Sequence, residues 1–385
     1  MPLPLRSNQA YEVLGAPPGE SPNGVRLSDT ESMKPSNRLQ LNYQQLAQTF
    51  RKLPYPIIDV HSHIHGGEAT AIYAQTAAEH GVGLTYSMTS LREIPRVKNI
   101  LGDRIRFIAV PDFANRDRRT AVGKGYIESL PLFKEHGAKI VKFWNAPRIY
   151  EASDEPFAKS PFKLNAPERR EVMKVAMDLG MIFMAHIADP DTWFSTKFKD
   201  ANRYGTKRQQ YEVFEEVLSQ FSAPWIAAHM GGYPEDLDFL SGLLERNGNL
   251  FLDCSATKWI VRELSKHPAE KTRAFFTRWK GRILFGSDIV TSDAHLSSAV
   301  NSSEMDAKAS TPEDAYDLYA SRYWALRTLL ETDHVGVSPI ADPDLHLVNP
   351  EEHSPLDAPM LRGCTLPDDV LQALYFDTAH RLLGT

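Results

Sequence analysis

The chain reads PIIDVHSH at residues 56–63, the first of eight short apolar runs along its 385 residues. The apolar part of this run predicts a short buried strand. Because side chains alternate along a strand, we expect Asp59, His61 and His63 to point to the same side. Two imidazoles two residues apart at the end of a strand can bind one metal ion from one direction. The run therefore predicts a strand that ends in a metal-binding pair.

Apolar runs and helical stretches alternate along most of the chain. Eight β-α units in series favour a parallel (β/α)8 barrel, the TIM barrel of the α/β class, with a doubly wound sheet as the alternative. Three long loops follow strands and would lie at the carboxyl face of a barrel, where active sites sit. The predicted strands are 57–62, 83–88, 105–110, 139–143, 181–186, 225–229, 249–253 and 282–287. The predicted helices are 68–80, 121–136, 167–179, 207–221, 233–246, 259–279, 313–331 and 367–383. The long loops are 144–166, 187–206 and 289–312.

Two parts of the chain are predicted to lie apart from this pattern. Residues 1–55 form an N-terminal extension, partly irregular, with a short helix over 43–52. Residues 56–385 form the barrel with its C-terminal helix, and the segment 333–366 is expected to be an irregular excursion over the surface.

Composition narrows the class of protein. Hydrophobic residues make up 42% of the chain and charged residues 24%, as in soluble globular proteins. The net charge of −6 gives no support to binding of nucleic acid or of an anionic membrane. Two cysteines are too few for a disulfide framework, and the first residues lack the apolar core of a signal peptide. We therefore predict a cytoplasmic protein that acts on a small molecule.

Polar residues recur where the predicted strands end. His186 ends the fifth and Asp288 the eighth, so His61, His63, His186 and Asp288 are the predicted metal ligands, with a position left for water. Imidazole and carboxylate donors suit one divalent ion, Zn²⁺ first and Mn²⁺, Fe²⁺ or Co²⁺ as alternatives. Such an ion would lower the pKa of water and polarise a substrate oxygen.

Five motifs in order resemble the amidohydrolase superfamily, most closely its amidohydrolase 2 branch, which includes proteins like aminocarboxymuconate-semialdehyde decarboxylase. The resemblance runs from about residue 56 to the C-terminus. The motifs are DVHSH at 59–63, GAKIVK at 137–142, AH at 185–186, HMGG at 229–232 and FGSD at 285–288, and residues 371–383 are similar to the last helix of the branch. The chain departs from the branch at Phe143-Trp144-Asn145, in the substrate region, so no relative's substrate is transferred.

The resemblance implies roles for further residues. Asp288 would take a proton from the activated water as well as bind metal, although an Asp also suits a helix N-cap. His229 would lie beside the metal and move protons or stabilise an oxyanion. In this branch the lysine at the Lys142 position more often stays free, so we predict a free Lys142. The alternative, as in dinuclear relatives, is a carboxylated Lys142 that bridges a second metal. Lys142, Arg148 and Trp144 are the predicted substrate-binding residues, with rim or packing roles as the plainer alternatives.

These observations predict a metal-dependent hydrolase of a small carboxylated molecule, cleaving a C–N, C–O or lactone bond. Non-oxidative decarboxylation on the same site is the alternative, because fold and metal do not determine the reaction. A metal-binding barrel without enzymatic activity is a third interpretation, disfavoured because every expected ligand position is filled. A homodimer is the assembly that the resemblance suggests.

Overall fold

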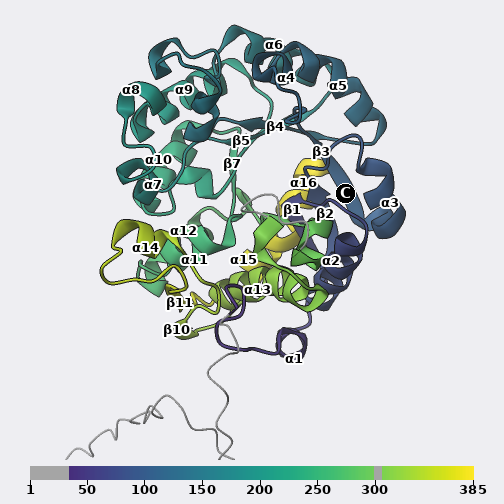
Figure 1. Ribbon diagram of the computed structural model, residues 1–385, viewed down its shortest axis with the longest axis vertical. Helices are drawn as coiled ribbons and strands as arrows, with labels where there is room; N and C mark the ends of the chain where they lie inside the picture. Colours follow the sequence, from purple (N-terminus) through teal and green to yellow (C-terminus); the bar gives the residue numbers. More distant parts are fainter. Residues whose placement is uncertain (1–33, 299–305) are drawn as a thin grey trace, which may run out of the picture. The chain divides into compact units, whose positions relative to one another are not determined.

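Parallel strands ring the centre of the molecule and helices surround them (Figure 1). The computed structural model describes residues 34–298 and 306–385. The strands are β1 (Ile57–His63), β2 (Val82–Ser87), β3 (Ile105–Ala109), β4 (Ile140–Trp144), β5 (Ile182–His186), β6 (Trp225–Ala227), β7 (Leu250–Asp253), β8 (Ile283–Leu284) and β9 (Ile289–Val290). They pair in the order β8-β7-β6-β5-β4-β3-β2-β1-β9, all in parallel.

The eighth strand of the barrel is made of two short pieces. β8 pairs with β7 and β9 pairs with β1, so one stretch of chain bridges the two ends of the sheet. Between the pieces, the amide of Val60 donates to the carbonyl of Phe285 (2.9 Å), and the amide of Asp288 donates to the carbonyl of His61 (2.8 Å). These bonds close the ring, so the predicted (β/α)8 barrel is confirmed and the doubly wound alternative is wrong.

The helices follow the strands in the predicted alternation. They are α1 (Tyr43–Ala47), α2 (Glu68–Glu79), α3 (Ile94–Leu101), α4 (Arg118–Val122), α5 (Lys124–Glu135), α6 (Pro167–Asp178), α7 (Asp191–Ser195), α8 (Ala201–Tyr204), α9 (Lys207–Gln220), α10 (Leu237–Arg246), α11 (Thr257–Leu264), α12 (Ala269–Arg278), α13 (Pro312–Glu331), α14 (Asp344–Val348), α15 (Asp368–Gln372) and α16 (Thr378–Leu383). The single helix predicted over 259–279 is two helices, because Pro268 cannot continue α11. A π-helical turn, Ala373–Asp377, joins α15 to α16.

The segment 333–366 is more ordered than predicted. It contains α14 and a small antiparallel pair, β10 (Val335–Val337) and β11 (Met360–Arg362). The prediction of a wholly irregular excursion is wrong because each of these strands has only three residues, too few to show a periodic pattern.

The inside of the barrel is a separate apolar cluster. It takes alternate residues from the strands, among them Val60, Ile140, Met184 and Leu284, and α16 contributes Leu383. On β4 and β5, the positions two residues after Ile140 and Met184 are Lys142 and His186, which carry polar groups of the site because alternation keeps them on the inner side.

Strand β1 breaks this alternation. Ile58 and Val60 belong to the inner cluster, yet His61 also turns inward, while Asp59 reaches outward to Tyr323 of α13. The pairing register shifts between Asp59 and Ser62, as at a β-bulge, which re-aims side chains. The expectation that Asp59 shares a face with His61 is therefore wrong.

The part of the N-terminal extension that the structure describes packs on the barrel. Tyr43 of α1 is 1% exposed and contacts Trp324 of α13. Residues 1–33, the rest of the predicted extension, lie outside the described residues. Across residues 34–298 and 306–385, we find no helix with the length and apolarity needed to span a bilayer.

Candidate metal centre

A cavity of about 540 Å³ lies at the carboxyl ends of the barrel strands. His186 at the end of β5, His229 just after β6 and Asp288 in the split eighth strand line it. Arg148, from the loop after β4, lines it too. The cavity is therefore on the face where barrel enzymes hold their active sites.

Three predicted ligands converge beside this cavity. Oδ1 of Asp288 lies 3.2 Å from Nε2 of His63 and 3.4 Å from Nε2 of His61. The three ligand atoms all lie within 4.8 Å of one another. Burial alone would raise the pKa of Asp288, but the two histidines hold it well below its usual range. Two imidazole nitrogens and a carboxylate form a donor set that fits a divalent metal ion.

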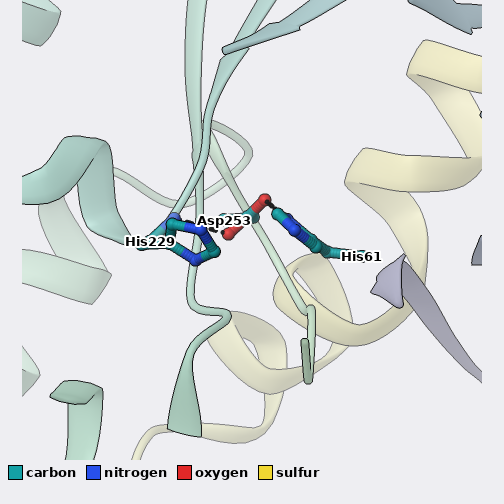
Figure 2. Close-up of side chains that lie close together, drawn as sticks. All are labelled: His61, His229 and Asp253. Carbon is teal, nitrogen blue, oxygen red and sulfur yellow. Dashed lines mark hydrogen bonds and ion pairs between the residues drawn. The ribbon is translucent and has the colours of Figure 1, made fainter. Parts of the chain in front are cut away.

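Asp253, at the end of β7, lies between the rings of His61 and His229 (Figure 2). Its Oδ2 accepts a hydrogen bond from Nδ1 of His61 at 2.8 Å, and its side chain is fully buried. Because a carboxylate only accepts, Nδ1 of His61 must carry the hydrogen. In the neutral ring, Nε2 then carries the lone pair that faces His63 and Asp288, and this is the tautomer that a metal ligand needs.

Ser255 extends the same support to His229. The Ser255 hydroxyl donates to Oδ1 of Asp253 and contacts Nδ1 of His229 at 2.8 Å. Since that hydroxyl has given its hydrogen to Asp253, it can only accept from His229. Burial, together with His186, holds the pKa of His229 well below its usual range. His229 is therefore neutral, with the lone pair of Nε2 available.

The group of His61, His229 and Asp253 is thus a hydrogen-bonded support. Its ligand atoms also lie within 4.8 Å of one another. However, Oδ1 of Asp253 already accepts from the backbone amides of His229 (2.9 Å) and Ser255 (3.1 Å), and Oδ2 accepts from His61. These occupied oxygens leave Asp253 no role as a metal ligand.

His186, the fourth predicted ligand, lies close to the cluster with its ring turned to one side. Its ring centroid is 4.5 Å from that of His229. Its Nε2 lies 3.0 Å from Oδ1 of Asp189, in the loop after β5. The structure thus places His186 at the cavity, and its ligand atoms are outside the three-residue group that converges on Asp288.

The side chain of Lys142, on β4, extends to the candidate metal ligands. Its Nζ lies 3.4 Å from Nε2 of His61, and the side chain is buried. Burial lowers the pKa of Lys142 to about 8, against the opposite pull of Asp253 and Asp288. Its predicted proximity to the metal ligands is therefore seen in the structure.

Asp59 supports Asp288 through its neighbour in the chain. Its carboxylate accepts from the hydroxyl of Ser287 (2.6 Å), the amide of Ser287 (3.1 Å) and the hydroxyl of Tyr323 (2.8 Å). Burial raises the pKa of Asp59 to about 6. These bonds attach the Ser287-Asp288 turn to β1 and α13.

The predicted substrate residues divide into two groups. Arg148 lines the cavity, and Lys142 lies next to the metal ligands. Trp144 packs edge to face on Phe113, with ring centroids 5.8 Å apart, and is absent from the part of the cavity lining that the structure describes.

Sequence reasoning missed Asp253, Ser255, Lys258 and Arg322. Asp253 carries the same signal as the predicted ligands, a polar residue ending an apolar strand. Lys258 and Arg322 line the cavity from helices α11 and α13. No pattern at the strand ends points to these two residues.

The family model described as amidohydrolase matches residues 97–385. The chain belongs to the amidohydrolase family. The predicted family is confirmed, and with it the prediction of an enzyme that uses a divalent metal. The matched range begins after β2, so His61 and His63 of this amidohydrolase lie outside it. No curated protein matches the chain in a sequence search.

A comparison with solved structures finds weak similarity of this amidohydrolase to several of them. One is a probable 2-pyrone-4,6-dicarboxylic acid hydrolase from Acinetobacter baumannii, 12% identical with a TM-score of 0.44, covering 86% of this chain and 100% of that one. Others are 2,6-dihydroxybenzoate decarboxylase from Rhizobium (13%, TM-score 0.37, covering 70% and 99%) and 5-carboxyvanillate decarboxylase from Novosphingobium aromaticivorans (9%, TM-score 0.40, covering 86% and 97%). At these identities and TM-scores the similarity carries no argument about activity.

Proposed function

We propose that this amidohydrolase hydrolyses a C–N, C–O or lactone bond of a small carboxylated molecule with one divalent metal ion. The observation that supports it best is the convergence of His61 Nε2, His63 Nε2 and Asp288 Oδ1, with His61 oriented by Asp253. His186 is proposed as a further ligand, after a turn of its ring away from Asp189. Zn²⁺ fits these donors best, and Mn²⁺, Fe²⁺ and Co²⁺ share them.

Asp288 and His229 are proposed to have different roles in the hydrolysis. A bound divalent ion would supply Lewis acidity, which activates water and polarises a carbonyl oxygen. Asp288 is a carboxylate at neutral pH and accepts the proton of the attacking water. His229 orients that water through the free lone pair of Nε2, since its Nδ1 hydrogen is held by Ser255. A neutral His229 in this tautomer does not donate to an oxyanion, which revises the role expected from the sequence.

Lys142 and Arg148 are proposed to bind the substrate carboxylate. The Lys142 ammonium lies beside the metal ligands, and Arg148 lines the cavity wall. Decarboxylation remains the second candidate, favoured by these same cations, because they would hold a carboxylate next to the metal. Release of CO2 from a labelled carboxyl group, in place of a hydrolysis product, would assign that reaction.

The test uses three histidine variants of the full chain. His61→Ala and His63→Ala are expected to lose most bound metal, measured by elemental analysis, together with turnover of lactones, amides or aromatic acids. His65→Ala is the matched control, since His65 lies just past β1 and outside the ligand group. Full metal content and activity in both His61→Ala and His63→Ala would reject the proposed site.

A further inference from the structure

Two cationic side chains face the cavity from the outer helices. Lys258 lies on α11 and Arg322 on α13, and both line the cavity. Among the described residues, Lys258 has no ion pair or hydrogen bond. Arg322 donates only to the hydroxyls of Ser36 (3.2 Å) and Ser321 (2.8 Å), with no carboxylate at ion-pair distance in the described chain. The wall therefore presents two positive charges that have no described carboxylate at ion-pair distance.

The carboxylates on the same walls already have partners. Asp342 pairs with Arg262, and Asp344 pairs with Arg262 at 3.1 Å and with Lys197 at 3.8 Å. Asp189 contacts His186 at 3.0 Å. Asp342 and Asp344 therefore have cations nearer to them than Lys258.

Leaving these cations unpaired has a cost. Burial lowers the pKa of Arg322 to about 10, and burial also lowers the pKa of Lys258. A largely buried charge without a partner is unfavourable for folding, and such groups cluster at functional sites. The pair is thus better explained by a ligand than by stability.

Arg322 is also held in place. The hydroxyl of Tyr43 donates to the carbonyl of Ser36 at 3.0 Å, and Nδ2 of Asn37 donates to Asp317 of α13 at 3.0 Å. The Tyr43 bond lies within the segment 34–43, and the Asn37 bond attaches this segment to α13 next to Arg322. The Ser36 hydroxyl is therefore a defined acceptor for the Arg322 guanidinium. Orientation of the guanidinium before binding is what a specific anion site needs.

We propose that Lys258 and Arg322 bind a second anionic group of the substrate. The substrate would then be a dianion, with one end at the metal ligands and an oxyanion at the α11–α13 wall. This inference rests on the proposed function only for the end of the substrate that reacts at the metal ligands. A carboxylate and a phosphate share the chemistry that a guanidinium and an ammonium recognise, so the experiment includes both.

The test measures binding by calorimetry to the full chain loaded with Zn²⁺. The probes are isophthalate with two carboxylates, benzoate with one, and inorganic phosphate. We expect isophthalate to bind at least about tenfold more tightly than benzoate, as charged hydrogen bonds predict. Lys258→Gln and Arg322→Gln should each reduce isophthalate affinity about tenfold and leave benzoate affinity unchanged. Arg322→Lys should recover part of the loss, because it keeps the charge.

The controls separate this proposal from other causes. Lys174→Gln removes an exposed cation of α6 that pairs with Glu171, and it should change none of the affinities. Thermal unfolding verifies that each variant is folded. Equal affinity for isophthalate and benzoate, or an unchanged preference in both Gln variants, would overturn the proposal. Inorganic phosphate that competes with isophthalate for the wild type, but no longer competes for Arg322→Gln, would assign the subsite to a phosphorylated substrate.

Metal-free protein distinguishes this inference from the proposed function. Binding of phosphate or isophthalate that depends on Arg322 in the metal-free chain supports the subsite, even where metal-loaded protein shows no turnover. Turnover by metal-loaded protein with no dependence of binding on Lys258 or Arg322 supports the metal centre and rejects the subsite.

Discussion

Asp253→Asn is the substitution that best tests the geometry of the metal centre. The change keeps the size of a fully buried side chain and removes its charge. Oδ1 accepts from the amides of His229 and Ser255 and from the Ser255 hydroxyl, so the asparagine oxygen should occupy that position. The asparagine NH2 group then faces Nδ1 of His61. Because NH2 only donates, His61 must move its hydrogen to Nε2 and lose the lone pair that binds metal.

The magnitude follows from the contacts that are lost. Removing the group that orients a metal-bound histidine costs about 10- to 100-fold in metal affinity. This corresponds to about 1.4–2.8 kcal/mol of binding free energy. In the metal-free protein, the charge-assisted hydrogen bond at 2.8 Å becomes a neutral one, so the free energy of unfolding should fall by about 1–1.5 kcal/mol.

The assay is competition for Zn²⁺ or Mn²⁺ with a chelator, alongside urea unfolding of the metal-free protein. Ser255→Ala is the comparison variant. It removes a hydroxyl that contacts Nδ1 of His229 at 2.8 Å and Nδ1 of His61 at 3.1 Å, and it leaves the shorter His61–Asp253 bond in place. Ser255→Ala should bind metal as the wild type does and turn over more slowly. A folded Asp253→Asn protein with wild-type metal affinity would refute the tautomer argument.

Three further predictions test other parts of the structure. Lys142 should be a free amine in a protein with one metal per chain; a peptide mass increased by one CO2, with two metals bound, would contradict this. Burial lowers the pKa of His80 to about 4, so the neutral His80 stabilises the fold above pH 6.5, and this contribution is lost as the pH falls towards 4. Between neutral pH and pH 5, the free energy of unfolding measured in urea should fall by roughly 2 kcal/mol more in the wild type than in His80→Gln; an equal fall in both proteins would count against this prediction. Gly286→Ala would place a methyl group 2.9 Å from Cβ of His61, so it should lower the free energy of unfolding by about 1–3 kcal/mol and reduce metal affinity. Gly248→Ala is the control, because Gly248 has open space around it and the change should alter neither quantity; equal effects of the two substitutions would reject the steric argument.

The barrel could be predicted from the sequence because each strand is a compact apolar run with a helix after it. All eight strand positions hold to within a few residues. The split of the eighth strand was not predictable, since it depends on bonds from Val60 to Phe285 and from Asp288 to His61, which join residues more than two hundred positions apart. The direction of Asp59 was mispredicted for a related reason, because the bulge in β1 arises only from pairing with β2.

The candidate ligand positions could be proposed from the sequence because a polar residue at the end of an apolar strand is a strong local signal. This signal located His61, His63 and Asp288 and applied equally to Asp253. It could not separate ligand from support, since that depends on which nitrogen of His61 each carboxylate meets: Asp288 meets Nε2 and Asp253 meets Nδ1. The cations on α11 and α13 had no local signal, because folding brings helices to the cavity without regard to strand ends.

Two buried carboxylates connect the stability of the barrel to the chemistry of its site. His229 and Asp288 both have backbone angles in the left-handed region, with φ of +59°, at a cost of about 1–3 kcal/mol each. The amide of His229 is bound by Asp253 at 2.9 Å, and Ser287, next to Asp288, is bound by Asp59 at 2.6 Å. Each carboxylate therefore offsets strain at the residue that it helps to aim. It follows that removing the Asp253 carboxylate should weaken metal binding and folding together. Removing only the side chain of a proposed metal ligand such as His63 leaves the backbone pairing of β1 with β9 in place and should weaken metal binding alone.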